Sequence, residues 1–186
     1  MANVYDVADF FIELAEQYEE GEITNLKLNK LLYFAHGHYL AKTGKPLFDD
    51  PIEAWELGPV IPAIYHKYKM CGNHHIPATG KDVAGSFTDE EYSILLDTAR
   101  EYCKYTSAYL VGKTHEPETP WSQTSRNEVI DNARIASYFL SHDKIAHFSE
   151  TLAKKNIPAI GCRDNSGVLV LPADENDDYW DKYSEI

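Results

Sequence analysis

The segment 71–75, with the sequence Cys-Gly-Asn-His-His, holds the residue types that are best suited to bind a metal ion. A thiolate and imidazoles close in sequence match the ligands that zinc prefers. A four-ligand site would need a second pair at comparable spacing, but Cys103 and Cys162 each stand alone. His36 and His38 are two positions apart on a predicted helix, where side chains diverge. The segment therefore favours a polar surface loop over a zinc site.

Nucleophilic catalysis would need a cysteine beside a histidine, and the candidates are Cys71 or Cys103 with His115. Neither cysteine lies in a catalytic signature. Cys103 also falls on the apolar face of a predicted helix, which favours the core, and the chain lacks a glycine-rich phosphate-binding loop. We therefore predict a protein that is not an enzyme and needs no metal or cofactor. The alternative is a metal-dependent or cysteine enzyme centred on Cys71, His74, His75 and His115.

The spacing of apolar residues predicts a mainly α (α+β) fold, a compact bundle of about six or seven helices with a small β element. The helices are expected at residues 3–20, 24–43, 62–68, 88–103, 107–113, 128–140 and 143–155. Thr88 and Glu91 have the spacing of a capping box, which marks a helix start. Residues 52–57 indicate a short strand, and we expect Gly58 and Pro59 to end it.

The chain length of 186 residues suits one compact domain with a short tail. We assign residues 1–155 to a helical domain. A polar turn at 163–167 between two apolar runs predicts a β-hairpin, which we place at 156–173 and expect to pack on the helical domain. Residues 174–186 are acidic and contain few aliphatic side chains, so we predict a tail there.

The acidic excess lies at the two ends of the chain. The formal net charge is −13, from 17 basic and 30 acidic residues, yet residues 1–22 contain no Lys or Arg and residues 174–186 contain only one. Nucleic acids and anionic membranes attract clustered Lys and Arg, so we expect neither as a direct partner. The candidate acidic interaction surface consists of Glu13, Glu16, Glu20, Asp174, Glu175, Asp177 and Asp178.

Several features predict a cytoplasmic protein. No apolar run approaches the ~20 residues of a membrane-spanning helix, and the acidic first residues lack the pattern of a secretory signal. Three cysteines cannot all pair, which favours free thiols in a reducing compartment. The helices at 3–20 and 24–43 have the order of a helix-turn-helix, but they carry few bases, and we interpret them as a packing unit.

Three stretches of the sequence occur in an order that is characteristic of one protein family. The first is LKLNKLLYFAHGH at 26–38, which is followed by GKPLF at 44–48. The second is IEAWELGPVIP at 52–62, and the third is LVGKTHEPETPW at 110–121. Together they closely resemble the Panacea domain, whose family includes SocA-type antitoxins and phage-associated proteins of the GepA type.

The resemblance implies an antitoxin-like protein-binding module that neutralises a partner toxin of a toxin–antitoxin system. Two further roles stay open, an adaptor that hands the toxin to an ATP-dependent protease and a phage-borne protein. The expected location is the cytoplasm of a bacterium or of a phage-infected host cell. Because family members pair with many unrelated toxins, the domain does not identify its target.

The motif residues that we single out for a structural or partner-binding role are Leu28, Lys30, Leu31, Tyr33, Trp55, Gly58, Pro59, Tyr65, His115, Pro120 and Trp121. For all of them we favour fold maintenance over direct partner contact. Trp55 needs a hydrogen-bond partner for its indole N–H. Trp121 follows two prolines, and we expect it to hold their loop onto the core. Gly37 lets another backbone approach its helix closely.

Overall fold

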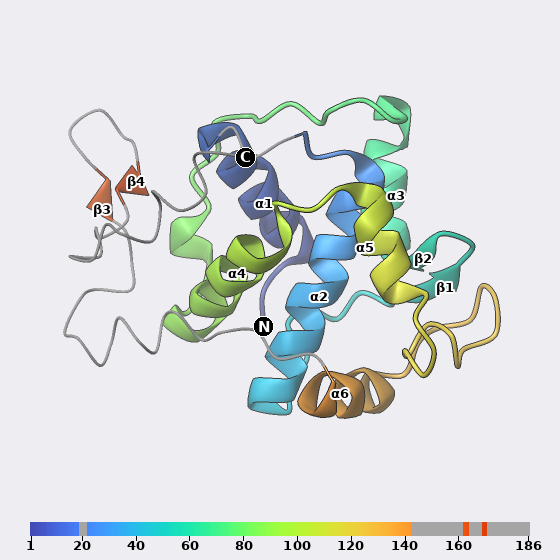
Figure 1. Ribbon diagram of the computed structural model, residues 1–186. Helices are drawn as coiled ribbons and strands as arrows, with labels where there is room; N and C mark the ends of the chain where they lie inside the picture. The colour runs from blue at the N-terminus through green and yellow to red at the C-terminus, as the bar shows by residue number, and fades with distance from the viewer. Residues whose placement is uncertain (19–21, 143–161, 164–168, 171–186) are drawn as a thin grey trace, which may run out of the picture. The chain divides into compact units, whose positions relative to one another are not determined.

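The computed structural model describes residues 1–18, 22–142, 162–163 and 169–170. The chain divides into two compact units, Met1–Ala146 and His147–Ile186. The helices and strands of the first unit (Figure 1) are α1 (Val4–Tyr18), α2 (Asn25–Thr43), β1 (Glu53–Trp55), β2 (Gly58–Val60), α3 (Pro62–Tyr68), α4 (Asp89–Tyr102), α5 (Ser107–Thr114) and α6 (Asn132–Ser141), with two short 3-10 turns, η1 (Lys69–Cys71) and η2 (Ala84–Ser86). The fold is thus mainly α with a small β element, as predicted.

The described residues of the second unit contain two short strands. β3 (Cys162–Arg163) pairs with β4 (Leu169–Val170) in an antiparallel arrangement, which confirms a C-terminal β-hairpin. The helix expected at 143–155 and the acidic tail at 174–186 lie outside the described residues.

α2 runs through the middle of the first unit (Figure 1) and contacts all five other described helices. Nearly all of its residues from Asn25 to Leu40 are buried, as expected for a helix that is apolar on every side. Its ends match the prediction. The Thr24 hydroxyl accepts a hydrogen bond from the Lys27 backbone N–H, and Gly44 takes the left-handed conformation that ends the helix.

Gly37 of α2 lies against the ring of Phe139 in α6. A β-carbon built at Gly37 would come within 2.3 Å of that ring, so this position requires a residue without a side chain. We had expected a second backbone to approach Gly37 closely. The group that approaches it is instead the buried aromatic side chain of Phe139.

α1 holds the loop between α3 and α4 through its acidic side chains. The Glu13 carboxylate accepts a hydrogen bond from the Thr79 backbone N–H at 2.7 Å, and Glu16 Oε2 lies 3.1 Å from His75 Nε2. Lys81 pairs with two further α1 carboxylates. Two members of the candidate acidic interaction surface, Glu13 and Glu16, thus have partners within the chain. The other members, Glu20, Asp174, Glu175, Asp177 and Asp178, lie outside the described residues.

β1 and β2 form an antiparallel hairpin in which Trp55 lies opposite Gly58. The expectation that Gly58 and Pro59 end a strand was wrong, because both belong to β2 and the turn falls at residues 56–57. The chain near residue 130 pairs with the other side of β1, where the Ile130 N–H donates to the Ile52 carbonyl oxygen at 2.8 Å. This pairing explains why α6 begins at Asn132 and not at residue 128.

Two helix starts in the second half of the first unit follow local sequence signals. Thr88 and Glu91 form the expected capping box at the start of α4. The Thr106 hydroxyl accepts a hydrogen bond from the Tyr109 N–H and begins α5, which ends at Thr114, immediately before His115, as predicted. These two helices lie on either side of the loop that carries Tyr105.

Candidate functional site

The β1–β2 hairpin is attached to α2 by two buried side chains. Lys30 Nζ donates a hydrogen bond to the Pro59 carbonyl oxygen at 2.8 Å, and Asn29 Oδ1 accepts one from the Ile61 N–H at 2.8 Å. Asn29 is itself oriented by Asn25, to which it donates at 2.9 Å. The Pro59 carbonyl oxygen in β2 and the Ile61 N–H just after β2 therefore have partners on α2, which fixes the hairpin on the central helix.

Lys30 is a charged residue type in a site that excludes water. Its side chain is 0% exposed, and burial lowers the pKa of its amino group from 10.5 to about 7, because the charged form loses its hydration.

Gly58 lies beside the amino group of Lys30. A β-carbon built at Gly58 would be 2.9 Å from Lys30 Nζ and 2.5 Å from Thr114 Oγ1. Gly58 also has a φ of 99°, which favours glycine. Both the space and the backbone conformation thus require glycine here.

The hairpin is held from its other end by the segment after α5. Trp121 Nε1 donates to the Trp55 carbonyl oxygen at 2.7 Å, and His115 Nε2 lies 3.2 Å from the Glu56 carbonyl oxygen. The rings of His115 and Trp121 pack together with centroids 3.7 Å apart. Thr119 donates its hydroxyl to the Thr114 carbonyl oxygen and fixes the loop between these aromatic residues. Trp121 thus holds the proline-containing loop on the hairpin, as expected.

Four apolar or aromatic side chains on the hairpin and beside it reach the surface. Trp55 Nε1 donates to Glu53 Oε2 at 2.8 Å, and the Trp55 ring packs on Tyr65 of α3 with centroids 4.9 Å apart. Val129 pairs with Glu53 across the strands and is 58% exposed, while Leu57 at the hairpin turn is 54% exposed. We name this set, Trp55, Leu57, Tyr65 and Val129, the hairpin surface.

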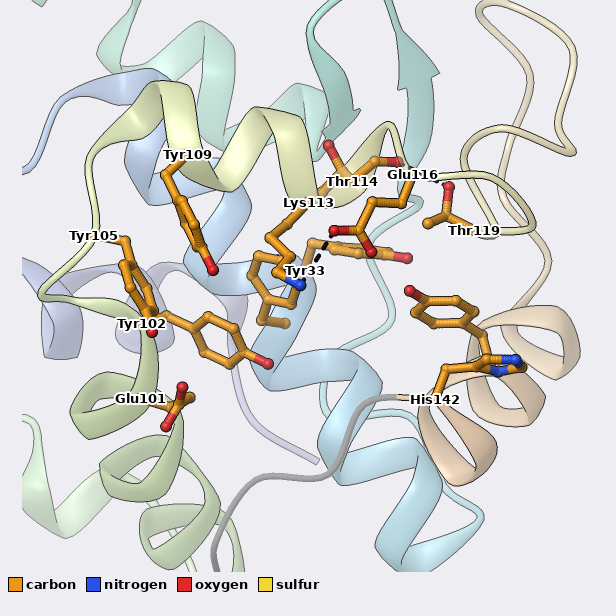
Figure 2. A pocket seen from close by; sticks show the side chains of 12 residues that line it. Tyr33, Glu101, Tyr102, Tyr105, Tyr109, Lys113, Thr114, Glu116, Thr119 and His142 are labelled. Atoms are coloured by element: carbon orange, nitrogen blue, oxygen red, sulfur yellow. Dashed lines mark hydrogen bonds and ion pairs between the residues drawn. The ribbon is translucent and has the colours of Figure 1, made fainter.

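A cleft with a volume of about 200 Å³ opens on the other side of the segment after α5 (Figure 2). Its lining comes from α2, α4, α5, α6 and the loops that flank α5. The lining residues are Tyr33, Phe34, Glu101, Tyr102, Tyr105, Tyr109, Lys113, Thr114, Glu116, Thr119, Tyr138 and His142. Because five of the twelve are tyrosines, we name it the tyrosine cleft.

Most of the predicted motif residues meet around the hairpin. Those that contact it or belong to it are Lys30, Trp55, Gly58, Pro59, Tyr65, His115 and Trp121. Leu28 and Leu31 lie in the core at 0% exposure, Pro120 is buried, and Tyr33 forms part of the floor of the tyrosine cleft. Fold maintenance explains the buried residues, whereas Trp55 and Tyr65 reach the surface.

Sequence reasoning missed several residues of this region. Asn29 lies in the first family stretch, but its bond to Ile61 spans 32 positions and has no local signal. Tyr102, Tyr105 and Tyr109 recur at a spacing of three and four, which is a visible pattern in the sequence.

The residues of the enzyme alternative have separate surroundings. His75 contacts Glu16 and the Ile23 N–H, whereas His115 packs on Trp121. Cys71 is half-buried and His74 is exposed. In the part of the chain that the structure describes, no group of three or more His, Cys, Asp or Glu side chains is placed to hold a metal ion.

None of the helices within residues 1–18 and 22–142 combines the length and the apolar character that a membrane crossing requires.

The hairpin and its supports fall within a recognised domain. The family model of the antitoxin SocA-like Panacea domain matches residues 28–122, which is half of the chain, and the chain belongs to this family. One relative is Antitoxin SocA of Caulobacter vibrioides (strain NA1000 / CB15N), which is 48% identical over 54 residues. That alignment spans 29% of this chain and 29% of the relative. The search of solved structures gave no significant match.

Family membership supports an antitoxin-like role for the chain. The matched range contains α2 from Leu28 onward, the hairpin, α3, α4, α5 and Trp121, whereas α1 and α6 lie outside it. Trp55, Leu57 and Tyr65 of the hairpin surface and most of the lining of the tyrosine cleft therefore lie within the family domain, whereas Val129 lies outside the matched range.

Proposed function

We propose that the protein is the antitoxin of a toxin–antitoxin pair and neutralises its toxin by binding it directly in the bacterial cytoplasm. The observation that carries the proposal is the match of half of the chain to the SocA-like Panacea domain. The 48% identity to a protein named Antitoxin SocA, over part of both chains, supports the same role.

The hairpin surface is the part of the domain that we assign to toxin contact. Trp and Tyr are enriched among the residues that dominate binding energy at protein interfaces. Trp55 lies on the hairpin, and Tyr65 of α3 packs against it. Because Lys30, Asn29 and Trp121 hold the hairpin in place, little conformational entropy would be lost on binding. Leu57 and Val129 add two exposed apolar side chains, one at the turn of the hairpin and one on the segment that pairs with β1.

Direct occlusion of the toxin and its transfer to an ATP-dependent protease both begin with this contact. They differ in the fate of the toxin, because only the adaptor mechanism shortens the lifetime of the toxin. A pulse-chase measurement of toxin turnover with and without this protein separates the two. Occlusion, the mechanism that we propose, leaves toxin turnover unchanged.

The acidic character of the chain supports a basic toxin surface as the target. A net charge of −13 attracts a cationic partner over a distance and raises the rate of association, and the effect weakens as salt screens it. A phage-borne origin is compatible with this role, since direct binding to a toxin does not depend on the replicon that encodes the antitoxin.

The test is co-expression with the product of the reading frame next to the gene of this protein. We expect that product to stop growth alone and to be harmless with the wild-type chain. Leu57→Asp should fail to restore growth, because it places a charge in the apolar contact. Leu140→Asp is the matched control, since Leu140 on α6 is 61% exposed and lies outside the hairpin surface.

The possible outcomes test the antitoxin role and the assignment of the hairpin surface to toxin contact separately. A neighbouring product that is harmless alone, or one that remains toxic with the wild-type chain, would contradict the antitoxin role. Full growth with L57D at wild-type melting temperature would leave that role intact and remove the hairpin surface from toxin contact.

A further inference from the structure

The tyrosine cleft combines aromatic faces with carboxylates. Tyr33 and Phe34 of α2 line it, and the rings of Tyr105 and Tyr109, which also line it, stack with centroids 4.2 Å apart and planes inclined by 21°. Glu101, at the end of α4, also lines it. Figure 2 shows these side chains around one opening. Aromatic faces carry negative potential, so rings and carboxylates together favour a cation.

Two lysines of the chain already contact an aromatic ring or a carboxylate at this site. Lys104 Nζ lies 5.2 Å from the centroid of the Tyr105 ring. Lys113 pairs with Glu116 at 3.1 Å, and Figure 2 shows its side chain reaching into the opening above Tyr33. The cleft therefore accommodates positive charge beside its rings.

Arginine fits this combination better than lysine does. Its guanidinium is planar, stacks on aromatic faces, is weakly hydrated and binds a carboxylate through two parallel hydrogen bonds. Among the described residues, Glu101 pairs with Lys104 at 3.8 Å, and the side chains of this pair are 40% and 51% exposed. Such an exposed pair contributes little, so an incoming guanidinium can replace the lysine at Glu101.

The charge of the chain argues against an anionic occupant. A phosphate or a nucleic acid strand would meet the carboxylates of Glu101 and Glu116 at the rim. The net charge of −13 repels it further, whereas the same charge steers a cationic partner toward the protein.

We propose that the tyrosine cleft is a receptor for an arginine side chain that the partner protein presents from a basic surface. The proposal rests on the proposed function in one respect, that the partner is the toxin. The guanidinium stacks against Tyr105 and Tyr109 and pairs with Glu101. Residues 114–121 contact the hairpin through His115 and Trp121 and line the cleft through Thr114, Glu116 and Thr119, so the cleft adjoins the segment that holds the hairpin.

The first experiment uses the full chain and the acetylated, amidated tripeptide Gly-Arg-Gly, with Gly-Lys-Gly and Gly-citrulline-Gly as comparisons. Binding is followed by the ring resonances of Tyr105 and Tyr109. We expect the arginine peptide to shift these signals at concentrations where the citrulline peptide, which is isosteric but neutral, does not. Equal shifts with arginine and citrulline, or none with arginine, would overturn the proposal.

Two variants test the carboxylate. Glu101→Gln should weaken binding of the arginine peptide by about tenfold, the loss expected for a hydrogen bond to a charged group. Glu90→Gln is the matched control, because Glu90 is an exposed acid of the same helix that does not line the cleft. Equal weakening by both variants would mean that only net charge matters and would contradict a built receptor.

A third variant tests the resident lysine. Lys113→Met removes a competing ammonium from the opening and should tighten binding of the arginine peptide. Weaker or unchanged binding in K113M would count against replacement of one cation by another.

A toxin-neutralisation assay with Tyr109→Ala distinguishes failure of the arginine receptor from failure of the proposed antitoxin role. If Y109A abolishes peptide binding and reduces toxin neutralisation, the results support both the receptor and the antitoxin role. If the wild-type chain neutralises the toxin and Y109A does so equally well, the cleft is not part of toxin recognition while the antitoxin role remains. If the wild-type chain does not neutralise the toxin, the proposed function fails, whatever the peptide result.

Discussion

Lys30 donates a hydrogen bond from its amino group to the Pro59 carbonyl oxygen at 2.8 Å, from a side chain that is 0% exposed. This bond joins the middle of the central helix α2 to the second strand of the hairpin. It makes the position of the hairpin surface dependent on a buried ionisable group. The consequences extend to pH dependence, to the glycine beside the bond and to partner binding.

The first prediction concerns the pH dependence of stability that Lys30 confers. The pKa of Lys30 is about 7 in the folded chain, because burial lowers it from the ordinary 10.5 of a lysine in water. Between these values the unfolded chain binds the proton that the folded chain lacks, so the free energy of unfolding rises with pH across this window. Below pH 7 the full cost of burying the charge applies. We expect Lys30→Met to remove this rise.

The measurement is the urea midpoint of wild type and K30M at pH 7 and pH 9. Lys42→Met is the control, because Lys42 is an exposed lysine of the same helix. A pH slope in K30M equal to that of the wild type would contradict the assignment of the low pKa to Lys30.

His36 provides a second pH-dependent contribution, at lower pH. Burial lowers its pKa from 6.5 to about 4, partly offset by the hydrogen bond to Asn132 at 3.0 Å. Between pH 6.5 and pH 4 the unfolded chain binds more protons, so stability falls as pH falls through this range. His36→Gln keeps a group that can bond to Asn132, and it should lose less stability between pH 7 and pH 5 than the wild type does. Thermal melting at the two pH values tests this, with the exposed His66→Gln as control.

The third prediction concerns Gly58, where both the backbone conformation and the surrounding side chains disfavour a β-carbon. Gly58→Ala should lower the free energy of unfolding by at least about 2 kcal/mol, because alanine is strained at a φ of 99° and its β-carbon meets Thr114 and Lys30. Gly80→Ala is the matched control, since Gly80 has a φ of 72° but nothing within 4 Å, and it should lose about 1 kcal/mol. Equal losses from chemical denaturation of the two variants would show that the contacts at Gly58 do not matter.

Gly37 tests the packing of α6 on α2. Gly37→Ala should destabilise by about 1–3 kcal/mol, because the β-carbon would meet the Phe139 ring in the core. Gly112→Ala is the control on α5, where nothing lies within 4 Å of the added carbon. It should be stabilising by about 0.5–1 kcal/mol, the helix preference of alanine over glycine. A stabilising G37A would mean that α6 does not pack at Gly37.

The sequence predicted those features that depend on nearby residues. α2 follows from its apolar content together with the local caps Thr24 and Gly44, and α4 follows from the capping box of Thr88 and Glu91. These signals act within one turn of a helix, so a single sequence displays them.

The features that were missed depend on contacts between distant segments. Gly58 and Pro59 belong to a strand because α2 and Thr114 shape the space around them. The start of α6 is displaced because residues before Asn132 pair with β1. Burial of Lys30 also depends on tertiary contacts. A lysine between leucines in the sequence does not indicate whether its amino group reaches solvent or bonds to a distant carbonyl oxygen.

The claim that the hairpin surface binds a toxin is tested most directly by measuring the affinity of the full chain for the purified product of the neighbouring reading frame. We predict a tight complex with the wild type and with L140D, and a dissociation constant at least about tenfold higher for L57D, the effect of losing one central apolar contact. An affinity of L57D equal to that of L140D would contradict the account.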